Sequence, residues 1–370
     1  MKIICQQHKL INSINIAIKA VSSKTTMPIL ECLIINAESD TIKLIANDLE
    51  IGIETTLEGN IIEQGSIALN AKVFSDIIRK LPDSEITIET DDNNKTTILS
   101  EKSKFEIYGF GTEEFPFLPN FEKENPVVLS QFSLKEVIRQ TVFSIADNES
   151  SRIMSGLLFE IVENSLKVVS LDGHRISVRN IKLDENYEDI KVIVPGKTLS
   201  EVSKILSGEV DDEVNMYFTD RHILFEFDKT IVLSRLIEGE YFNINQMFSS
   251  DYETKVKINK KDMLNCIDRS TLFVKETDKK PIVFNVIDNK IEFKMNSSIG
   301  SMNDEIEIEK NGKDIIIGFN PKFLVDALRV IDDETIEIYL INQKSPCFIK
   351  DEQETYMYLI LPVNINAEIY

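Results

Sequence analysis

The chain has 370 residues, and its 41 Lys and Arg against 62 Asp and Glu give a formal net charge of −21. This length indicates two or three domains, and the acidity excludes a surface that is basic all round but allows a local basic face. The four cysteines are scattered without a Cys-x-x-Cys pair, no apolar run reaches the roughly 20 residues of a membrane helix, and the first residues lack the apolar stretch of a signal peptide. We therefore expect a cytoplasmic protein without a disulfide framework.

Apolar periodicity predicts six helices separated by strand-like segments. In chain order the predicted helices cover residues 8–20, 72–80, 133–140, 197–206, 259–270 and 321–330. Paired alternating apolar runs, each broken by a polar turn, predict hairpins over residues 30–48, 155–173 and 281–297. The same order of strand, helix, hairpin, strand, helix and strand thus occurs three times.

The recurrence has a fixed period, which identifies an internal repeat. Lys72, Lys197 and Lys322 each lead the second helix of a copy, and successive members lie 125 residues apart. A period this long indicates triplication of a domain rather than a solenoid. The three predicted α+β domains cover residues 1–125, 126–250 and 251–370.

A second basic residue follows each leading lysine by seven positions. The pairs are Lys72 and Arg79, Lys197 and Lys204, and Lys322 and Arg329. Seven residues make about two helical turns, so both charges of a pair share one face. Apolar residues two, five and nine positions after the lysine form the opposite, buried stripe. Each copy should therefore present two cations to solvent.

The predicted helices are basic although the chain is acidic, because they contain 14 Lys and Arg but only six Asp and Glu. Lys and Arg favour solvent-facing helix positions in many proteins, so a single basic helix supports no functional conclusion. The same offset in three copies favours a shared role, the binding of a phosphate backbone without base readout. The absence of Trp argues against a stacking platform for single strands.

The repeats, the tract Ser170–Ile176 and the ending Leu359–Val363 resemble the bacterial DNA sliding clamp, the beta-subunit family of DNA polymerase III. Further matching pieces are Met27-Pro28-Ile29-Leu30, Asn47-Asp48-Leu49-Glu50 and Phe115-Pro116. The resemblance covers the whole chain. It implies the DNA-clamp fold, with antiparallel sheets outside and two helices per domain facing a central hole. It also implies a ring-shaped head-to-tail homodimer that encircles duplex DNA, slides without sequence specificity and serves replication as a non-catalytic processivity factor.

The resemblance adds DNA-facing residues to the helix pairs. Lys24 precedes the Pro-Ile-Leu element, Arg152 lies in a tract that touches DNA in relatives, and Lys197 matches another such position. The complete expected set is Lys24, Lys72, Arg79, Arg152, Lys197, Lys204, Lys322 and Arg329.

The resemblance also implies a peptide-binding groove between the second and third domains. In the family this groove receives short linear motifs of the replicative polymerase, the clamp loader and repair proteins. The matching wall residues are Met154, Leu171, Gly173, His174, Arg175, Ile176, Phe242, Leu359, Ile360, Leu361, Pro362 and Val363. Phe242 stands where relatives often carry a proline, and the chain continues past Pro362 to Tyr370 without the usual arginine. The peptide preference is therefore expected to differ.

For the ring joint, the family pairs a strand of the first domain with a helix end of the third. The matching residues are Phe105 and Ile107 against Leu272 and Phe273. From charge alone, Lys102 and Lys104 could meet Asp304 and Glu305 across this joint.

A hydrolase-type enzyme is the alternative interpretation, with a catalytic cluster of Asp172, His174 and Arg175. The same residues fit a tight Asp-Gly turn between two strands. No metal-ligand spacing stands out, and the sequence Gly-Phe-Gly at residues 109–111 lacks the third glycine of a dinucleotide fingerprint. We therefore expect neither a metal nor a cofactor.

Overall fold

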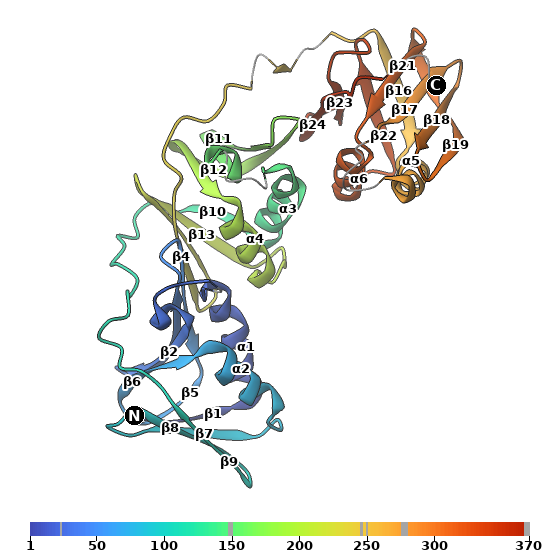
Figure 1. The fold of residues 1–370 in the computed structure, drawn as a ribbon. Coiled ribbons are helices and arrows are strands. Elements are labelled where there is room, and N and C mark those ends of the chain that lie inside the picture. The colour runs from blue at the N-terminus through green and yellow to red at the C-terminus, as the bar shows by residue number, and fades with distance from the viewer. Residues whose placement is uncertain (23, 147–150, 245–246, 249–250, 275–279, 366–370) are drawn as a thin grey trace. The chain divides into compact units, whose positions relative to one another are not determined.

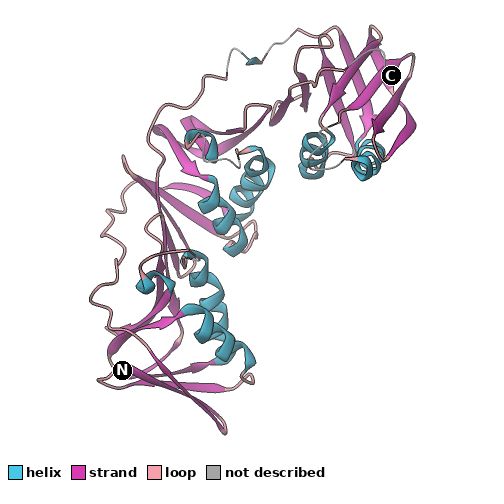
Figure 2. Ribbon diagram, viewed as in Figure 1, coloured by secondary structure: helices cyan, strands magenta, loops and turns pink. Residues whose placement is uncertain are grey.

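A computed structural model describes residues 1–370 except 23, 147–150, 245–246, 249–250, 275–279 and 366–370 (Figure 1). The chain divides into two compact units. The first unit comprises residues Met1–Leu134 and Ser200–Leu236, and the second comprises Lys135–Leu199 and Ile237–Tyr370. Both units combine antiparallel sheets with a few helices, as Figure 2 shows.

Two antiparallel sheets build the first unit. The strands of the smaller sheet are β1 (Lys2–Gln6), β5 (Gly59–Glu63), β7 (Glu85–Thr90), β8 (Lys95–Ser100) and β9 (Ser103–Tyr108). The strands of the larger sheet are β2 (Cys32–Glu38), β3 (Thr41–Asn47), β4 (Ile51–Leu57), β6 (Gly65–Asn70), β10 (Val127–Ser130), β13 (Glu213–Phe218), β14 (His222–Phe227) and β15 (Thr230–Arg235). Their orders are β5-β1-β7-β8-β9 and β10-β13-β14-β15-β4-β3-β2-β6, so β9 is an edge strand.

The helices α1 (Gln7–Ala17) and α2 (Ala71–Lys80) lie side by side in the first unit (Figure 1). Asn70 caps α2, because its side chain accepts a hydrogen bond from the backbone N–H of Val73. The helix buries Phe74 and Ile78 against the sheets. Basic residues in its last turn complement the negative end of the helix dipole.

The larger sheet of the first unit joins two repeats. Strand β4 of the first repeat pairs with β15 of the second, with Thr55 opposite Thr230. Both hydroxyls are buried and hydrogen-bond each other at 2.9 Å. The pairing satisfies backbone groups that would otherwise form an exposed sheet edge.

The second unit also has two sheets. The strands of its larger sheet are β11 (Gly156–Leu171), β12 (Arg175–Pro195), β16 (Thr254–Asn259), β20 (Glu309–Gly312), β22 (Thr335–Leu340), β23 (Cys347–Lys350) and β24 (Tyr356–Ile360). The smaller sheet contains β17 (Ile282–Ile287), β18 (Lys290–Ser297), β19 (Gly300–Glu307) and β21 (Ile315–Phe319). The orders are β11-β12-β24-β23-β22-β16-β20 and β19-β18-β17-β21. Strand β24 of the third repeat thus pairs with β12 of the second, as β15 pairs with β4.

The remaining helices are α3 (Gln131–Thr141), α4 (Gly196–Ile205), α5 (Lys260–Ser270) and α6 (Pro321–Val330). All six helices predicted from periodicity are confirmed with ends within about three residues. The residues 18–20, which the sequence assigns to the first helix, continue α1 as a 3-10 turn. Asn259 and Asn320 cap α5 and α6 in the way that Asn70 caps α2.

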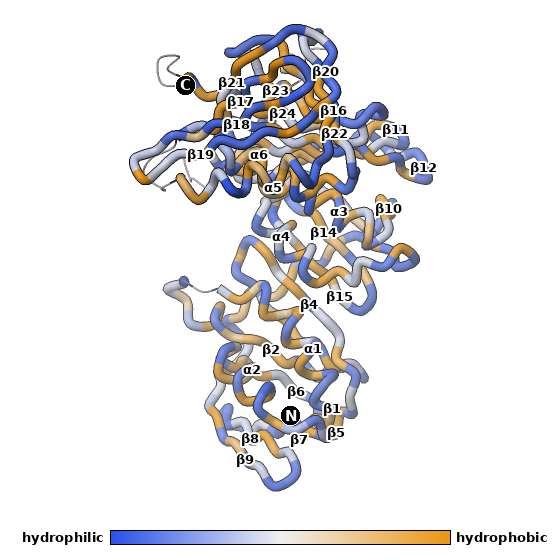
Figure 3. The backbone as a smooth tube through the Cα atoms, turned by 90° about the vertical axis from the view of Figure 1, so that its right-hand side faces the viewer, coloured by the Kyte–Doolittle hydropathy of each residue, from blue (hydrophilic) through white to orange (hydrophobic). Residues whose placement is uncertain are grey.

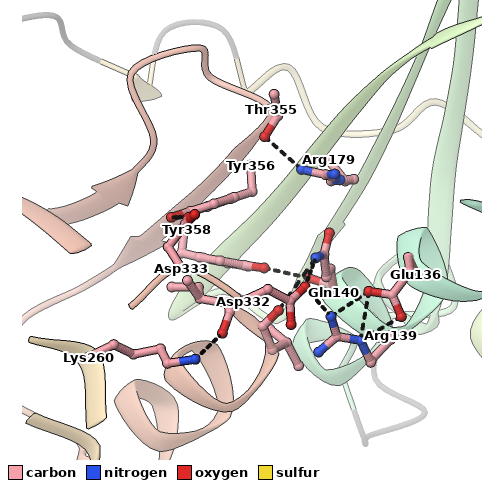
Figure 4. A network of polar contacts seen from close by, with 12 residues as sticks. Glu136, Arg139, Gln140, Arg179, Lys260, Asp332, Asp333, Thr355, Tyr356 and Tyr358 are labelled. Carbon is pink, nitrogen blue, oxygen red and sulfur yellow. Dashed lines mark hydrogen bonds and ion pairs between the residues drawn. The ribbon is translucent and has the colours of Figure 1, made fainter. Parts of the chain in front are cut away.

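A polar network within the second unit connects α3 and β12 to the third repeat (Figure 4). Arg139 on α3 pairs with Asp332 at 2.7 Å, and Tyr358 on β24 donates to the backbone oxygen of Gln140 at 3.2 Å. Tyr356 donates to Asp333 at 2.6 Å, and burial, together with this hydrogen bond, raises the pKa of its phenol well above the usual range. These contacts supplement the shared sheet at the boundary between two repeats.

Hydrophobic and hydrophilic stretches alternate along the strands (Figure 3). The inward residues of β17, β18, β21 and the helices α5 and α6 form one buried apolar cluster in the second unit. Within the described part of the chain, no helix is both long and apolar enough to cross a membrane. The four cysteines are buried and unpaired, as expected from their spacing.

Candidate nucleic-acid and peptide interfaces

The six cations predicted to share helix faces are all exposed. Lys72 and Arg79 lie on α2, Lys197 and Lys204 on α4, and Lys322 and Arg329 on α6. The opposite stripe is buried as predicted, except that Ile77 is only half-buried and Ile78 enters the core of its repeat beside it. The heptad spacing therefore does separate charge from core in each repeat.

Cations from two repeats line one cleft in the first unit. The cleft, of about 400 Å³, lies among α1, α2 and the end of α4, and its polar walls include Asn15, Lys19, Arg79 and Lys204. Arg79 donates to Asn15 Oδ1 at 2.8 Å. Lys204 pairs with Glu201 at 2.7 Å, and these exposed contacts are weak enough to exchange for an anion. Lys19 was not singled out by the sequence, because it belongs to the first helix rather than to the repeated pairs.

Helix α6, which has Lys322 and Arg329, lies beside α5 in the second unit. Arg329 contacts Asp268 of that helix at 3.0 Å, and both side chains are more than half exposed. Lys24 and Arg152, assigned from the resemblance, are also exposed. Among the described residues, no group of three or more His, Cys, Asp or Glu side chains could hold a metal ion.

The Asp172 turn connects β11 and β12. Asp172 Oδ1 accepts hydrogen bonds from the backbone N–H groups of His174 and Arg175 at 2.9 and 3.2 Å. Gly173 has a φ of +87°, a conformation that glycine adopts without a steric penalty. This is the tight turn that the sequence offered as the alternative to a catalytic cluster.

Arg175 is a buried anchor and exposes only 7% of its surface. Its guanidinium donates to Asp172 at 2.9 Å, to Asp326 on α6 at 2.7 Å and to the backbone oxygen of Phe143 at 2.6 Å. The ring of Phe323 lies 4.5 Å from the guanidinium carbon, within range of a cation–π interaction. Arg175 therefore stabilises the packing of α6 against the turn and offers no free charge to a ligand.

His174 lies at the surface beside this anchor. Its ring stacks on Phe323 with 6.0 Å between centroids. Asp172 is occupied by two backbone N–H groups and the Arg175 guanidinium, so it does not orient the imidazole as the acid of a catalytic triad would. The arrangement favours a binding surface over a hydrolase site.

The residues assigned to the groove meet around the pairing of β12 and β24. Arg175 and Ile176 lie opposite Ile360 and Leu359, and the N–H of Leu361 donates to the oxygen of His174 at 2.8 Å. The accessible members are Gly173, His174, Phe242 and Leu361, with Met154, Pro362 and Val363 half-buried. The buried members are Leu171, Arg175, Ile176, Leu359 and Ile360, which support the surface from beneath.

The first unit contains a turn of the same kind at Asp48, but a hydrogen bond ties it to a neighbouring segment. Asp48 accepts from the N–H groups of Glu50 and Ile51 at 3.0 and 2.8 Å, and Leu49 has a φ of +76° where the second repeat has Gly173. Asn47 takes the place of Leu171, and its amide donates to the oxygen of Pro116 at 2.7 Å. This hydrogen bond ties the turn to the following segment, so the repeats share a turn but differ in the surface beside it.

The residues assigned to the ring joint lie at sheet edges or beside them. Phe105 and Ile107 are on the edge strand β9, and Phe105 is 37% exposed. Leu272 is 75% exposed and follows α5, while Phe273 packs beside Gly300 at the start of the edge strand β19. Leu272 and Phe105 thus leave apolar surface open beside the edge strands β19 and β9.

Lys104, Asp304 and Glu305, three of the four charges suggested for this joint, have partners within the chain, whereas Lys102 makes no ion pair among the described residues. Lys104 and Lys95 lower the pKa of the Glu106 carboxyl to about 2. Asp304 pairs with Arg269, which lowers the pKa of that carboxyl, and Glu305 pairs with Lys290 at 2.9 Å. These exposed pairs could exchange partners across a joint at little cost.

Known proteins match the chain over nearly all of its length. Models of the DNA polymerase III beta subunit match residues 1–119 (N-terminal domain), 128–243 (central domain) and 245–364 (C-terminal domain). The beta sliding clamps of Staphylococcus epidermidis and Staphylococcus aureus are 33% identical over 364 residues, which cover 95% of this chain and 96% of each relative.

Solved structures are also similar to this chain over nearly all of its length. A crystal structure from Eubacterium rectale, described as a DNA polymerase III beta subunit, is 59% identical with a TM-score of 0.96, covering 99% of this chain and 100% of that one. The DNA polymerase sliding clamp of Bacillus subtilis is 32% identical with a TM-score of 0.95 and the same coverage.

Three-domain clamp architecture and a non-catalytic role in replication define the class of this protein. The chain belongs to the family of DNA polymerase III beta subunits, the bacterial sliding clamps. It is accordingly a processivity factor of DNA replication.

Replacing Arg175 by Gln should lower the free energy of unfolding by about 2–4 kcal/mol, because the half-buried carboxylates of Asp172 and Asp326 lose their buried cation. Urea unfolding followed by circular dichroism measures the change. Arg329→Gln breaks an exposed pair and should cost under about 0.5 kcal/mol. Equal effects of the two substitutions would show that Arg175 is not an anchor.

Proposed function

We propose that two copies of this chain close head to tail into a ring of six domains that encircles duplex DNA. The three domains cover residues 1–125, 126–250 and 251–370, in line with the matched family models. The observation that carries the proposal is the exposed pair of cations on the second helix of every repeat, in a chain of net charge −21. A closed ring of this kind is retained by topology, so weak and screened attraction to phosphates is sufficient and permits sliding.

The pairing of strands between repeats indicates which strands would join two copies into a ring. Strand β15 of the second repeat completes the sheet beside β4, and β24 of the third completes the sheet beside β12. By repeat position, β9 corresponds to β15 and β24, whereas β19 corresponds to β4 and β12. Both are edge strands of their sheets. Antiparallel pairing of β9 with β19 of a second copy would repeat the internal pairings, with Phe105, Ile107, Leu272 and Phe273 at the joint.

The surface around the Asp172 turn is the proposed peptide site. Gly173, His174, Phe242 and Leu361 are accessible above an apolar cluster, which suits a short motif anchored by leucine or an aromatic side chain. The replicative polymerase, the clamp loader and repair proteins would each bring such a motif. This role places the protein in the cytoplasm, where bacterial DNA is replicated.

Phe242 and Leu361 adjust the preference of this site. Phe242 is exposed beside the buried Tyr241, with 6.2 Å between the ring centroids in an edge-to-face arrangement. Where relatives have proline, this ring adds apolar area and narrows the groove. The site should therefore favour slimmer anchors than the proline-lined groove of the family.

The ring should be a dimer in solution. Light scattering should give about twice the chain mass of 42.3 kDa. Leu272→Arg should yield the single-chain mass, because a buried unpaired charge is costly at an interface. Ile62→Arg, at an exposed position of the edge strand β5, serves as the control and should stay dimeric. A monomeric wild type at micromolar concentration would overturn the proposed joint.

The helix cations should supply weak, salt-sensitive affinity for DNA. Replacing Lys72, Lys197 and Lys322 by Gln should weaken binding to linear duplex roughly tenfold and lower the salt slope by about three, since three phosphate contacts are lost. Fluorescence anisotropy measures both quantities. A control triple at Lys123, Lys229 and Lys313, which are exposed outside the helices, should leave the salt slope unchanged. Equal losses in both triples would assign DNA binding to net charge alone.

The groove should bind a short peptide that contains Gln and Leu. Leu361→Ser should weaken calorimetric affinity by about tenfold, because the apolar anchor loses its wall. Val162→Ser removes another exposed apolar side chain, from β11 outside the groove, and is the control. The groove assignment fails if the wild type gives no binding heat, or if both variants bind as the wild type does.

A further inference from the structure

A second cleft lies in the first unit, and neither the helix cations nor the residues of the Asp172 turn line it. It has a volume of about 530 Å³ and is lined by residues 26–29, where a 3-10 turn begins, and by Phe110, Gly111, Glu113 and Glu114. Met27 and Phe110, at its rim, are 44% and 51% exposed. Open apolar side chains of this size on opposite walls are typical of a binding surface.

Both walls are held in place by the fold. Phe110 makes two backbone hydrogen bonds with Ala68 of β6, at 2.9 and 3.1 Å. Thr112 shares a hydrogen bond of 2.8 Å with Ser66, and Phe115 is buried against Ile29 of the opposite wall. The cleft is therefore formed before any ligand arrives, and binding would cost little reorganisation of the protein.

The equivalent position in the second repeat has a different chemistry. Ile29 corresponds to Ile153, because each packs against the aromatic residue that closes its repeat, Phe115 or Tyr241. Two residues on the rim, Met27 and Pro28, are then replaced by Ser151 and Arg152. The apolar rim is thus not required by the fold that the two repeats share.

The opposite wall differs as well. Ile237 donates its N–H to Ile193, four residues before the leading lysine, just as Phe110 donates to Ala68. Ile237 is buried, whereas Phe110 is half-exposed. Of these two repeats, only the first has a large apolar side chain exposed at this position.

Two carboxylates lie at the end of the cleft. Glu113 and Glu114 line it and are exposed, and neither has a hydrogen bond or ion pair within the part of the chain that the structure describes. Neighbouring like charges of this kind favour a cationic partner. An apolar rim next to unpaired carboxylates fits a side chain such as Leu followed by Lys or Arg.

We propose that this cleft is a docking site for an extended segment of a partner protein in which an apolar residue adjoins a basic one. The apolar side chain lies between Met27 and Phe110, and the basic one meets Glu113 and Glu114. The site is separate from the groove at the Asp172 turn, so one chain can hold two different segments at once.

Methyl NMR of the full chain, labelled at its nine methionines, tests the proposal. The probe is the peptide acetyl-Gly-Ser-Leu-Arg-Leu-Lys-Ser-amide, and comparison with Met27→Leu assigns the reporter signal. The Met27 methyl should shift and saturate, while the Met154 methyl reports separately on the groove. Failure at Met27 would count against this cleft alone, since the groove is tested separately by the peptide that contains Gln and Leu.

Two control peptides and two variants complete the test. Replacing the basic residues of the probe by Glu, or its leucines by Ser, should abolish the shift at Met27. Glu113→Gln combined with Glu114→Gln should weaken binding at least about tenfold. Glu122→Gln with Glu124→Gln removes two exposed carboxylates outside the cleft and should change nothing. An unshifted Met27 methyl at millimolar probe, or equal binding of all three peptides, would overturn the proposal.

Discussion

An unpaired sheet edge is the constraint on which the organisation of this protein depends. Backbone N–H and C=O groups at an edge need partners, and an exposed edge invites association. In this chain the second repeat fills the edge of the first through β15 and β4, and the third fills the edge of the second through β24 and β12. Three repeats in a row leave β9 and β19 as complementary open edges. In the proposed ring a second copy would pair with both, so the ring would be a consequence of repetition.

The distribution of charge and the packing of the core both follow from the structure of the repeat. Each repeat has a helix that puts apolar residues into its core and leaves two cations on the exposed face. Only six of the 62 acidic residues lie in the six helices, so attraction to a polyanion is concentrated there. In the proposed ring, the closed topology keeps the protein on DNA. Electrostatic attraction to the phosphates therefore needs only to be weak and non-specific.

Periodicity predicted much of the fold because its signals are local. Lys72, Lys197 and Lys322 revealed the repeat, and their offsets to Arg79, Lys204 and Arg329 predicted the buried and exposed faces of three helices. Long-range contacts left no such signal. The ion pair between Arg175 and Asp326 joins residues 151 positions apart, and nothing in the sequence around either residue indicates it. From the sequence alone, Arg175 is therefore interpreted as a cation that binds a ligand. The structure shows it to be a buried anchor.

Differences between repeats were equally hidden. Asn47 and Leu171 occupy corresponding positions of two similar turns, but only coordinates show that the Asn47 amide closes its turn against Pro116. The open faces of Met27 and Phe110 likewise depend on how two distant segments pack. Repetition thus predicts the shared architecture, whereas side-chain divergence between copies decides which surface each copy offers.

Covalent closure of the ring on DNA is the sharpest test of whether the protein encircles the duplex. Cysteines placed at Ile107 and Leu272 can be linked by a bis-maleimide after the protein has been loaded onto a nicked circular plasmid. The native thiols interfere little, because burial raises their pKa values, to about 11 for Cys32 and about 12 for Cys5 and Cys266. A ring closed around DNA should stay with the circle in detergent and be released when the plasmid is cut. Release from the intact circle would contradict encirclement.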